Sequence, residues 1–573
     1  MALTVERAQA PQQQAGGGIP YKWVALSNTT LGILMATVNS SIVLISLPAI
    51  FRGIGLDPLA AGNVSYLLWL LIGYMLVTAV LVVTLGRLGD IYGRVRIYNA
   101  GFAVFALASA ALALVPFSGG GGALWLIGFR VVQGIGGSML MANSTAILTD
   151  AFPVHQRGMA LGINQVAGIA GSFLGLVVGG VLSEWDWRAV FWVSVPLGAL
   201  GTLWAYRSLR ETSQRGSGRI DWWGNVTFGT GLTVLLAGIT YGIQPYGGHS
   251  EGWTNPWVDA GIIGGLVLLA AFLAIERRVK DPMFHLELFR MRPFWTGATG
   301  VLAGAVARGG LQFMLIIWLQ GIWLPLRGYD YERTPLWAGI FLLPLTVGFL
   351  VAGPVSGYLS DKYGARLFTV GGMSIMALSF LGLLLLPTDF PYLGFAALIF
   401  LNGVGAGLYT APNMTAIMNS VPPTQRGASA GMVSTFQNSG MVLSMGVFFS
   451  LLIAGLAGSL PGSLRSGLLA QGVSQKAADT VAGLPPVGTV FASFLGYNPV
   501  GSLLAPTGEL QRLPAAARET VTGTSFFPHL VSGPFHDGLV VVFVLAAVMA
   551  ATAGVLAWVR GDTREHVHQD AHR

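Results

Sequence analysis

Gly86-Arg-Leu-Gly-Asp-Ile-Tyr-Gly-Arg-Val-Arg96 decides the fold of this chain, because it is a glycine-punctuated, charged turn between two long apolar runs. A second copy, Gly357-Tyr-Leu-Ser-Asp-Lys-Tyr-Gly-Ala-Arg366, repeats Gly, Leu, Asp, Tyr and Gly at the same relative positions 271 residues later. Another motif, Pro153 to Gly158, returns 269 positions on as Pro422 to Gly427. Two separate motifs that return at nearly one offset indicate an internal duplication.

The amino-acid composition indicates whether the folded chain is surrounded by water or by lipid. Of the 573 residues, 53% are hydrophobic and only 10% are charged, and the mean hydropathy is +0.66. Such a chain would overfill any soluble core, and many of its uncharged runs exceed the roughly 18 residues that mark a membrane-spanning helix. The sequence therefore predicts an all-α, polytopic membrane protein.

The apolar runs predict fourteen membrane spans. They cover residues 23–51, 63–85, 97–116, 123–149, 158–182, 188–208, 222–243, 257–275, 294–320, 336–358, 367–387, 392–418, 427–455 and 536–559. Two six-helix units of about 200 residues each fit the repeat offset only if two further helices lie between them. The predicted layout is therefore 6+2+6, with two pseudo-symmetric six-helix bundles.

This layout divides the chain into parts with different surroundings. They are a cytoplasmic tail (1–22), an N-terminal six-helix bundle (23–210), two linking transmembrane helices with a cytoplasmic loop (211–293), a C-terminal six-helix bundle (294–559) and a second cytoplasmic tail (560–573). Inside the last bundle lies a long outer loop, 456–534, which is too apolar for plain disorder. Two interpretations stay open for it: short helices at the membrane surface or over the outer opening, and a tolerated insertion.

The distribution of Lys and Arg predicts the orientation. With the N-terminus inside, the inner loops carry sixteen of these residues and the short outer loops carry four. Basic loops stay cytoplasmic, so we expect a plasma-membrane protein with both termini and both charged turns inside. The net charge of +7 then follows from topology, and a nucleic-acid partner, which needs a basic soluble face, is not expected.

Taken together, the duplicated G-x-L-x-D-x-x-G turns, the two six-helix halves and the fourteen spans resemble the major facilitator superfamily, specifically its fourteen-span drug:proton antiporter branch. Residues 34–50 resemble the first-helix signature of that branch, and Arg130-Val-Val-Gln-Gly134 resembles its fourth-helix arginine motif. Residues 187–198 resemble its entry to the sixth helix, with Ser194 in place of the usual Asn. The resemblance implies a secondary transporter that exports amphiphilic small molecules by alternating access, coupled to proton entry.

The resemblance also implies a cytoplasmic gate at the two charged turns. The glycines permit a tight turn and close helix approach, and the first acid can pair with a nearby arginine. The expected gate residues are Gly86, Asp90, Gly93, Arg94, Gly357, Asp361, Gly364 and Arg366. In the second copy Ala365 stands where the first has Arg94. The alternative interpretation is a solvated turn that only fixes topology.

Residues 168–180 resemble the fifth-helix antiporter motif of the family. Small residues four apart give a smooth helix face that can slide against a partner helix. The residues concerned are Gly171, Gly175, Gly179 and Gly180. Leu176 replaces the characteristic proline, so the glycines support exchange transport and the signature dipeptide does not. A purely packing role is the alternative.

Charges inside the spans are few and all positive. The 24 carboxylates fall in loops, tails or helix ends, whereas Arg130 and Arg308 lie within spans, where a charge is costly and usually serves a pathway. The family normally has Asp where this chain has Asn39. We hypothesise a neutral or positive central cavity that favours neutral or anionic amphiphiles; structural pairing of the arginines is the alternative. The expected cavity residues are Asn39, Arg130, Gln133, Asn164, Arg308, Gln312, Asn402 and Gln437.

A proton carrier would then be an acid near a helix end, and the two candidates are Asp150 and Asp537. The sequence has no nucleotide-binding loop, no H-E-x-x-H and no in-span carboxylate pair, so we expect neither an enzyme nor an ATP-driven pump, and no cofactor or metal.

The expected partners are a lipophilic small molecule, protons and the bilayer, with the chain acting as a monomer. The alternatives are an exporter of one anionic or lipid-like metabolite with weak or no proton coupling, and a non-transporting receptor of the same fold.

Overall fold

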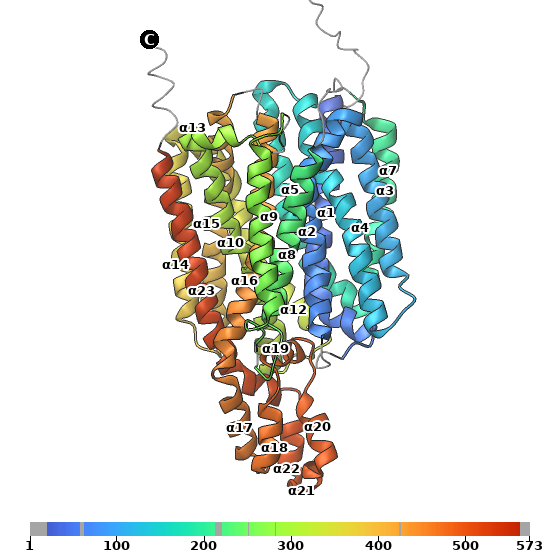
Figure 1. The fold of residues 1–573 in the computed structure, drawn as a ribbon, viewed down its shortest axis with the longest axis vertical. Coiled ribbons are helices and arrows are strands. Elements are labelled where there is room, and N and C mark those ends of the chain that lie inside the picture. The colour runs from blue at the N-terminus through green and yellow to red at the C-terminus, as the bar shows by residue number, and fades with distance from the viewer. Residues whose placement is uncertain are drawn as a thin grey trace, which may run out of the picture.

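A computed structural model describes residues 20–57, 62–211, 221–249, 251–280, 282, 284–422 and 426–561. Long helices stand side by side, and the start of the first and the end of the last lie at the same end of the molecule (Figure 1). A smaller helical lobe projects from the opposite end (Figure 1). Most of the two predicted tails lies outside the described residues.

The helices follow the predicted order of six, two and six. The first half contains α1 (Tyr21–Gly53), α2 (Asn63–Tyr92), α3 (Arg94–Ala113), α4 (Gly119–Ala151), α5 (Val154–Trp185), α6 (Ala189–Trp192) and its continuation α7 (Ser194–Ser208). The linking helices are α8 (Trp222–Gly242) and α9 (Pro256–Glu276), followed by the short turn η1 (Leu286–Arg290). The second half contains α10 (Arg292–Trp318), η2 (Leu319–Trp323), α11 (Leu324–Leu326), α12 (Thr334–Phe341), α13 (Leu343–Tyr363), α14 (Ala365–Leu384), α15 (Tyr392–Ser420), α16 (Arg426–Ala457) and α23 (Phe526–Arg560).

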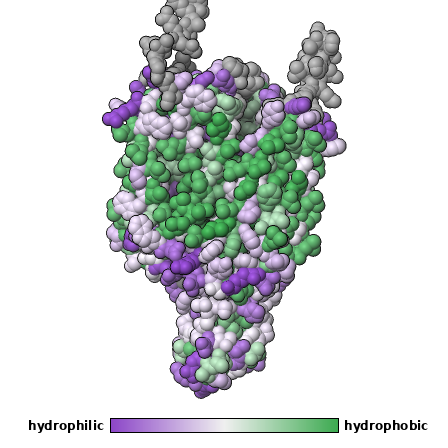
Figure 2. Space-filling view, turned by 180° about the vertical axis from the view of Figure 1, so that it is seen from behind, coloured by the Kyte–Doolittle hydropathy of each residue, from purple (hydrophilic) through white to green (hydrophobic). Residues whose placement is uncertain are grey.

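On the face seen in Figure 2, an apolar band crosses the bundle between two more polar ends. Within the described residues, thirteen helical segments are long and apolar enough to cross a membrane. Helix α8, which coincides with the seventh predicted span, is not among these thirteen; it carries no charge, but its five glycines and four threonines lower its hydropathy below that of the others. The chain is therefore a multi-pass membrane protein with the predicted all-α architecture.

The duplication is visible in individual contacts. Gln133 of α4 donates a hydrogen bond to Ser109 of α3 at 2.7 Å, and Asn402 of α15 donates one to Ser379 of α14 at 2.8 Å. These two bonds lie 269 to 270 positions apart, at the offset of the sequence motifs. Because the same helix pair carries the same bond in each half, the two bundles are built alike, as expected of a repeated transmembrane unit.

The long loop 456–534 is folded, which agrees with the first of its two interpretations. Its helices are α17 (Leu460–Ala470), α18 (Gln475–Ala482), α19 (Pro486–Phe494), α20 (Pro499–Leu504), η4 (Ala505–Thr507), α21 (Glu509–Arg512) and α22 (Ala515–Thr522). They form the lobe opposite the termini (Figure 1), which we call the cap. Every residue of α19 is buried, and Ser493 donates a hydrogen bond to the Gly321 carbonyl at 2.6 Å. The cap is thus anchored to the second half.

Helices α1 and α5 meet through the glycines of the fifth helix. A Cβ atom on Gly171 would overlap Thr37, one on Gly175 would overlap the Val38 carbonyl oxygen, and one on Gly179 would lie 2.9 Å from Ile42. The next residue, Gly180, faces Leu336 of α12 instead, where a Cβ would lie 2.6 Å from the Leu336 Cα. The glycines therefore let α5 touch α1 on one side and the second half on the other.

We expect Gly175→Ala to destabilise the protein by about 1–3 kcal/mol, because the new methyl group meets backbone that cannot turn away. Gly162→Ala is the matched control on the same helix, since a Cβ there meets nothing within 4 Å. Thermal unfolding of the two purified variants in detergent checks this. Equal melting temperatures for both would show that the helices separate easily at Gly175.

Candidate functional site

Arg130 is the centre of a buried polar network in the first half. It lies on α4 and is 1% exposed. Its guanidinium donates hydrogen bonds to Asn39 Oδ1 at 2.5 Å and to Gln133 Oε1 at 2.6 Å, and it lies 4.3 Å from the centre of the Tyr74 ring. The cation is therefore stabilised by neutral oxygens and an aromatic face, with no acid beside it.

The partners of Arg130 are themselves fixed by further helices. Asn39 donates from Nδ2 to Ser194 Oγ of α7 at 3.0 Å, and Gln133 donates to Ser109 of α3. Tyr74 of α2 donates its hydroxyl hydrogen to the Ala36 carbonyl of α1 at 3.0 Å. The network thus joins α1, α2, α3, α4 and α7. The side-chain oxygens that accept hydrogen bonds from Arg130 belong to neighbouring residues of the protein. Such pairing is what the alternative, structural interpretation of this arginine predicts.

Two other predicted cavity residues are also held inside one half. Asn164 of α5 donates to Ser144 of α4 at 2.9 Å, and Asn402 donates to Ser379 as described above. Both side chains are at least 95% buried. Together with Asn39, Arg130 and Gln133, they tie helices of one bundle together, and their hydrogen bonds give them a packing role.

The remaining three predicted cavity residues lie in the second half and are less enclosed. Arg308 and Gln312 of α10 and Gln437 of α16 are each half-buried. Gln312 Nε2 has no hydrogen-bond partner among the described residues. Helices α10 and α16 pack tightly beside them, since a Cβ on Gly309 would lie 2.7 Å from the Met441 Cα. The structure therefore separates the eight residues into two sets with different surroundings.

Two functional candidates in the second half escaped the sequence analysis. Tyr409 of α15 lies against α10, where a Cβ on Gly300 would meet its hydroxyl oxygen at 2.8 Å. Arg560, in the last turn of α23, is 6% exposed and donates hydrogen bonds to Asn413 Oδ1 and, at 3.2 Å, to Thr369 Oγ1. An arginine at a helix end resembles an ordinary topological charge, so no sequence signal distinguished Arg560.

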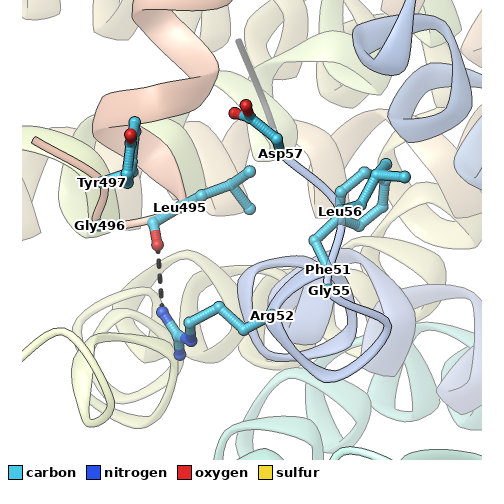
Figure 3. Close-up of a pocket in the computed structure, with 8 residues that line it drawn as sticks. All are labelled: Phe51, Arg52, Gly55, Leu56, Asp57, Leu495, Gly496 and Tyr497. Atoms are coloured by element: carbon cyan, nitrogen blue, oxygen red, sulfur yellow. Dashed lines mark hydrogen bonds between the residues drawn. The ribbon is translucent and has the colours of Figure 1, made fainter. Parts of the chain in front are cut away.

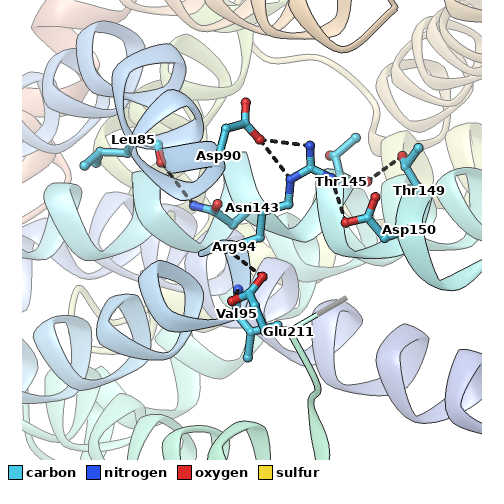
Figure 4. Close-up of polar contacts among 9 residues, drawn as sticks. All are labelled: Leu85, Asp90, Arg94, Val95, Asn143, Thr145, Thr149, Asp150 and Glu211. Atoms are coloured by element: carbon cyan, nitrogen blue, oxygen red, sulfur yellow. Dashed lines mark hydrogen bonds and ion pairs between the residues drawn. The ribbon is translucent and has the colours of Figure 1, made fainter. Parts of the chain in front are cut away.

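The first charged turn forms a compact ionic cluster (Figure 4). Arg94 donates to Asp90 at 2.9 Å and to Asp150 of α4 at 2.7 Å. Glu211, after α7, accepts hydrogen bonds from the backbone amides of Arg94 and Val95, each at 3.1 Å. Asp150, proposed above as a proton carrier, is therefore also a member of the gate cluster. The groups joined here all belong to the first half.

Both turns depend on glycine in the same two ways. Gly93 and Gly364 have φ angles of 114° and 91°, a backbone conformation that favours glycine. A Cβ on Gly86 would lie 3.5 Å from Ala142 and one on Gly357 would lie 3.8 Å from Ala411; the two glycines are 271 positions apart and the two alanines 269. The turns are thus equivalent in backbone and packing.

The second turn differs in its charged side chains. Arg366 places its guanidinium 4.0 Å from the centre of the Trp558 ring of α23, so its described contact is with an aromatic face instead of an acid. The side chain of Asp361 lies outside the described residues.

Asp537, the other proton-carrier candidate, is exposed on α23 and accepts a hydrogen bond from Ser459 at 2.7 Å. It sits where the cap joins the last helix.

The two halves and the cap meet at the end opposite the termini. Arg333 of the second half forms an ion pair with Glu184 of α5 at 3.2 Å, and Gln320 Nε2 donates to the Ile45 carbonyl of α1 at 3.2 Å. Arg52 donates to the Leu495 carbonyl of the cap at 3.1 Å beside a pocket of about 320 Å³ (Figure 3). These contacts join the two halves and the cap at this end of the molecule.

A duplicated bundle of membrane-spanning helices, with two turns equivalent in backbone and packing and with polar side chains buried between helices, is the architecture of a membrane transporter. The chain belongs to the Major Facilitator Superfamily, whose family model matches residues 29–445. It is thus a membrane transporter and not an enzyme.

Relatives and solved structures agree with this membership. The chain is 26% identical to the riboflavin transporter RibZ of Clostridioides difficile (strain 630), over 76% of this chain and 89% of RibZ. It is 29% identical to the multidrug resistance protein Stp of Mycobacterium tuberculosis (strain CDC 1551 / Oshkosh), over 76% and 77%. The structure of a bacterial homologue of the human lysosomal transporter Spinster, inward-facing and unoccupied, matches 95% of this chain and 98% of its own with a TM-score of 0.56 and 16% identity. That structural likeness shows the fold.

We expect Asn39→Ala to lower stability by about 2–4 kcal/mol, because it removes a hydrogen-bond acceptor from a buried guanidinium and leaves Ser194 without its donor. The melting temperature of the purified protein checks this against Val132→Ala, a lipid-facing control on α4 that is 37% exposed in the wild type. Asn39→Asp should restore stability, since a carboxylate accepts from Arg130 equally well. If all three variants unfold like the wild type, the network does not hold the first half together.

Proposed function

We propose that this protein is a secondary active transporter that exports amphiphilic small molecules across the plasma membrane by alternating access, with proton entry as the driving reaction. Its termini and both charged turns lie in the cytoplasm, and it acts as a monomer. The observation that carries the proposal is that two equivalent bundles are joined by polar contacts at the cap end, while the side-chain bonds of Arg94 go to Asp90 and Asp150 of the first half.

This arrangement supports a rocking cycle. The polar contacts that join the halves and the cap at the outer side are few among the described residues: one exposed ion pair and two hydrogen bonds to backbone carbonyls, beside the packing of α5 on α12. Exposed ion pairs are worth about 0–1 kcal/mol each, so a change in the bound species can break them. The glycine face of α5 supplies a close contact between the halves at Gly180, about which they can move.

The cluster of Asp90, Arg94 and Asp150 supports proton coupling at the cytoplasmic side. Two acids hold one arginine, so the cluster carries one net negative charge before Glu211 is counted. A proton on Asp150 removes that charge and one of the two ion pairs of Arg94. Protonation would therefore loosen the connection between α3 and α4, which is the kind of local charge change that biases a two-state element.

The names of the relatives support the substrate size and character. One relative is named for riboflavin and another for multidrug resistance, and both descriptions suit a transporter with a spacious, partly apolar cavity. The alternative, an exporter of one anionic metabolite, is favoured by the unpaired cation Arg308.

Transport is tested in proteoliposomes with an acidic lumen. We expect uptake of at least one of riboflavin, fluorescein and ethidium, accompanied by proton release and abolished by a protonophore. Liposomes containing heat-unfolded protein are the control. Uptake that persists unchanged with the protonophore would refute proton coupling, and no movement of any of the three would refute export of amphiphiles.

Asp150→Asn should remove proton-driven accumulation while leaving exchange of labelled for unlabelled probe intact, because Arg94 keeps Asp90 as a partner. Asp259→Asn, at the exposed start of α9, is the matched control and should behave like the wild type. Counterflow and pH-driven uptake are measured on the same vesicles. Loss of pH-driven uptake in Asp537→Asn instead of Asp150→Asn would move the proton site to the outer side.

A further inference from the structure

Arg308 differs from the other buried arginines of the membrane region in having no hydrogen-bond or ion-pair partner among the described residues. It lies near the middle of the continuous helical stretch Arg292–Leu326 and is half-buried. Arg130 and Arg560, by contrast, each bind two side-chain oxygens. A lone cation at this depth is costly unless a ligand or water neutralises it.

The groups around Arg308 are hydrogen-bond donors that also lack partners. Gln312, one helical turn further along α10, has an unbonded Nε2. The Tyr409 ring packs on α10 at Gly300 and Gly304, and a long side chain on a helix leans toward its N-terminal end, so Arg308 reaches toward that ring. The Tyr409 hydroxyl forms no hydrogen bond with the described residues. Arg308 and Gln312 thus lie on α10 and Tyr409 lies against it, and none of the three donors has a hydrogen-bond acceptor among the described residues.

Helix α16 adds amides on the same side. Gln437 precedes Gly440 and Met441 by three and four residues, and both of those contact α10, so Gln437 shares their face. The adjoining face of α16 packs on α2, with Gly431 against Val83. Asn438 lies between these two faces, and its Nδ2 is buried without a partner. These amides thus border the space between the two halves.

No carboxylate of the described residues lies at this depth to satisfy these donors. Helices α10, α15 and α16 contain no Asp or Glu. Asp537 of the neighbouring helix α23 is exposed where the cap joins that helix, and the ionic cluster around Arg94 belongs to the other half. A cationic ligand would find no counter-charge here. An acceptor with a full negative charge would satisfy every vacant donor at once.

We propose that Arg308, assisted by Tyr409, Gln312 and Gln437, binds the acidic headgroup of an amphiphile, so that the transported substrates are anions bearing a carboxylate, sulfonate or phosphate. The proposal rests on the proposed transport function and names its substrate class. Two sources carry such a headgroup, a soluble organic anion and an anionic lipid. Arg130, which is bound to Asn39 and Gln133, takes no part in the recognition.

The test is equilibrium binding to the purified full-length protein. Three fluorescent probes are titrated: fluorescein as a soluble anion, NBD-labelled phosphatidylglycerol as an anionic lipid, and ethidium as a cation. We expect at least one anion to bind wild type, and Arg308→Gln to weaken that binding about tenfold or more, with Arg308→Lys intermediate. Arg207→Gln, which removes an exposed charge at the end of α7, should bind like the wild type.

Stability separates recognition from a packing role. Removing an unpartnered cation should leave the melting temperature of Arg308→Gln equal to or above that of wild type, whereas a structural arginine would lower it. Binding of the lipid alone assigns the site to a lipid headgroup, and binding of fluorescein assigns it to soluble anions. The proposal is overturned if neither anion binds wild type, if Arg308→Gln binds them unchanged, or if ethidium binding falls in parallel.

The outcomes of the two proposals are distinguishable. A protein that binds an anion through Arg308 yet moves no probe across vesicles would refute transport and keep the binding site. A protein that transports fluorescein equally well with Arg308→Gln would refute the binding site and keep transport. Binding is measured without a pH gradient, so the binding result does not depend on proton coupling.

Discussion

Hydrocarbon offers no hydrogen bonds, and this constraint governs where polar side chains sit in the bundle. Arg130 meets it by binding Asn39 and Gln133, whose remaining amide hydrogens go to serines on α7 and α3. One charge therefore organises five helices of the first half. Because each partner is neutral, the network stabilises the cation by dipoles and fixes the packing of these helices.

The second half solves the same problem differently. Asn402 repeats the bond of Gln133 with its own serine, but the residue at the repeat position of Arg130 is Ile399, fully buried and apolar. Its charges lie elsewhere: Arg560 is satisfied at the end of α23, and Arg308 stays without a described partner on α10. Duplication thus preserved the helix contacts while the polar centres diverged: the charge of the first bundle is bound within it, and Arg308 of the second has no hydrogen-bond or ion-pair partner among the described residues.

Sequence patterns predicted the architecture well because each pattern has a direct physical cause. Span length follows from bilayer thickness, and positions Gly93 and Gly364 require glycine for their backbone angles. Helix α8 was placed by its lack of charge although its hydropathy is low. The apolar composition of residues 456–534 indicated that this loop could be folded. The cap is held in place by the burial of α19 against the second half, and such a long-range contact leaves no periodic signal in the sequence.

Polar residues within spans were harder to interpret, because an amide has the same sequence signature whether it binds a neighbour or a ligand. Asn164 and Arg308 were both expected to line a cavity, yet the first is bound to Ser144 and the second has no described partner. The two residues differ in whether a side chain on another helix binds them, and this difference is visible only in the folded structure. The sequence analysis treated Arg130 and Arg308 alike, but the fold distinguishes them: Arg130 is bound to two side-chain oxygens, and Arg308 has no hydrogen-bond or ion-pair partner among the described residues. A charge kept unpaired at this depth lowers stability, so its retention is best explained by a ligand that neutralises it during the cycle.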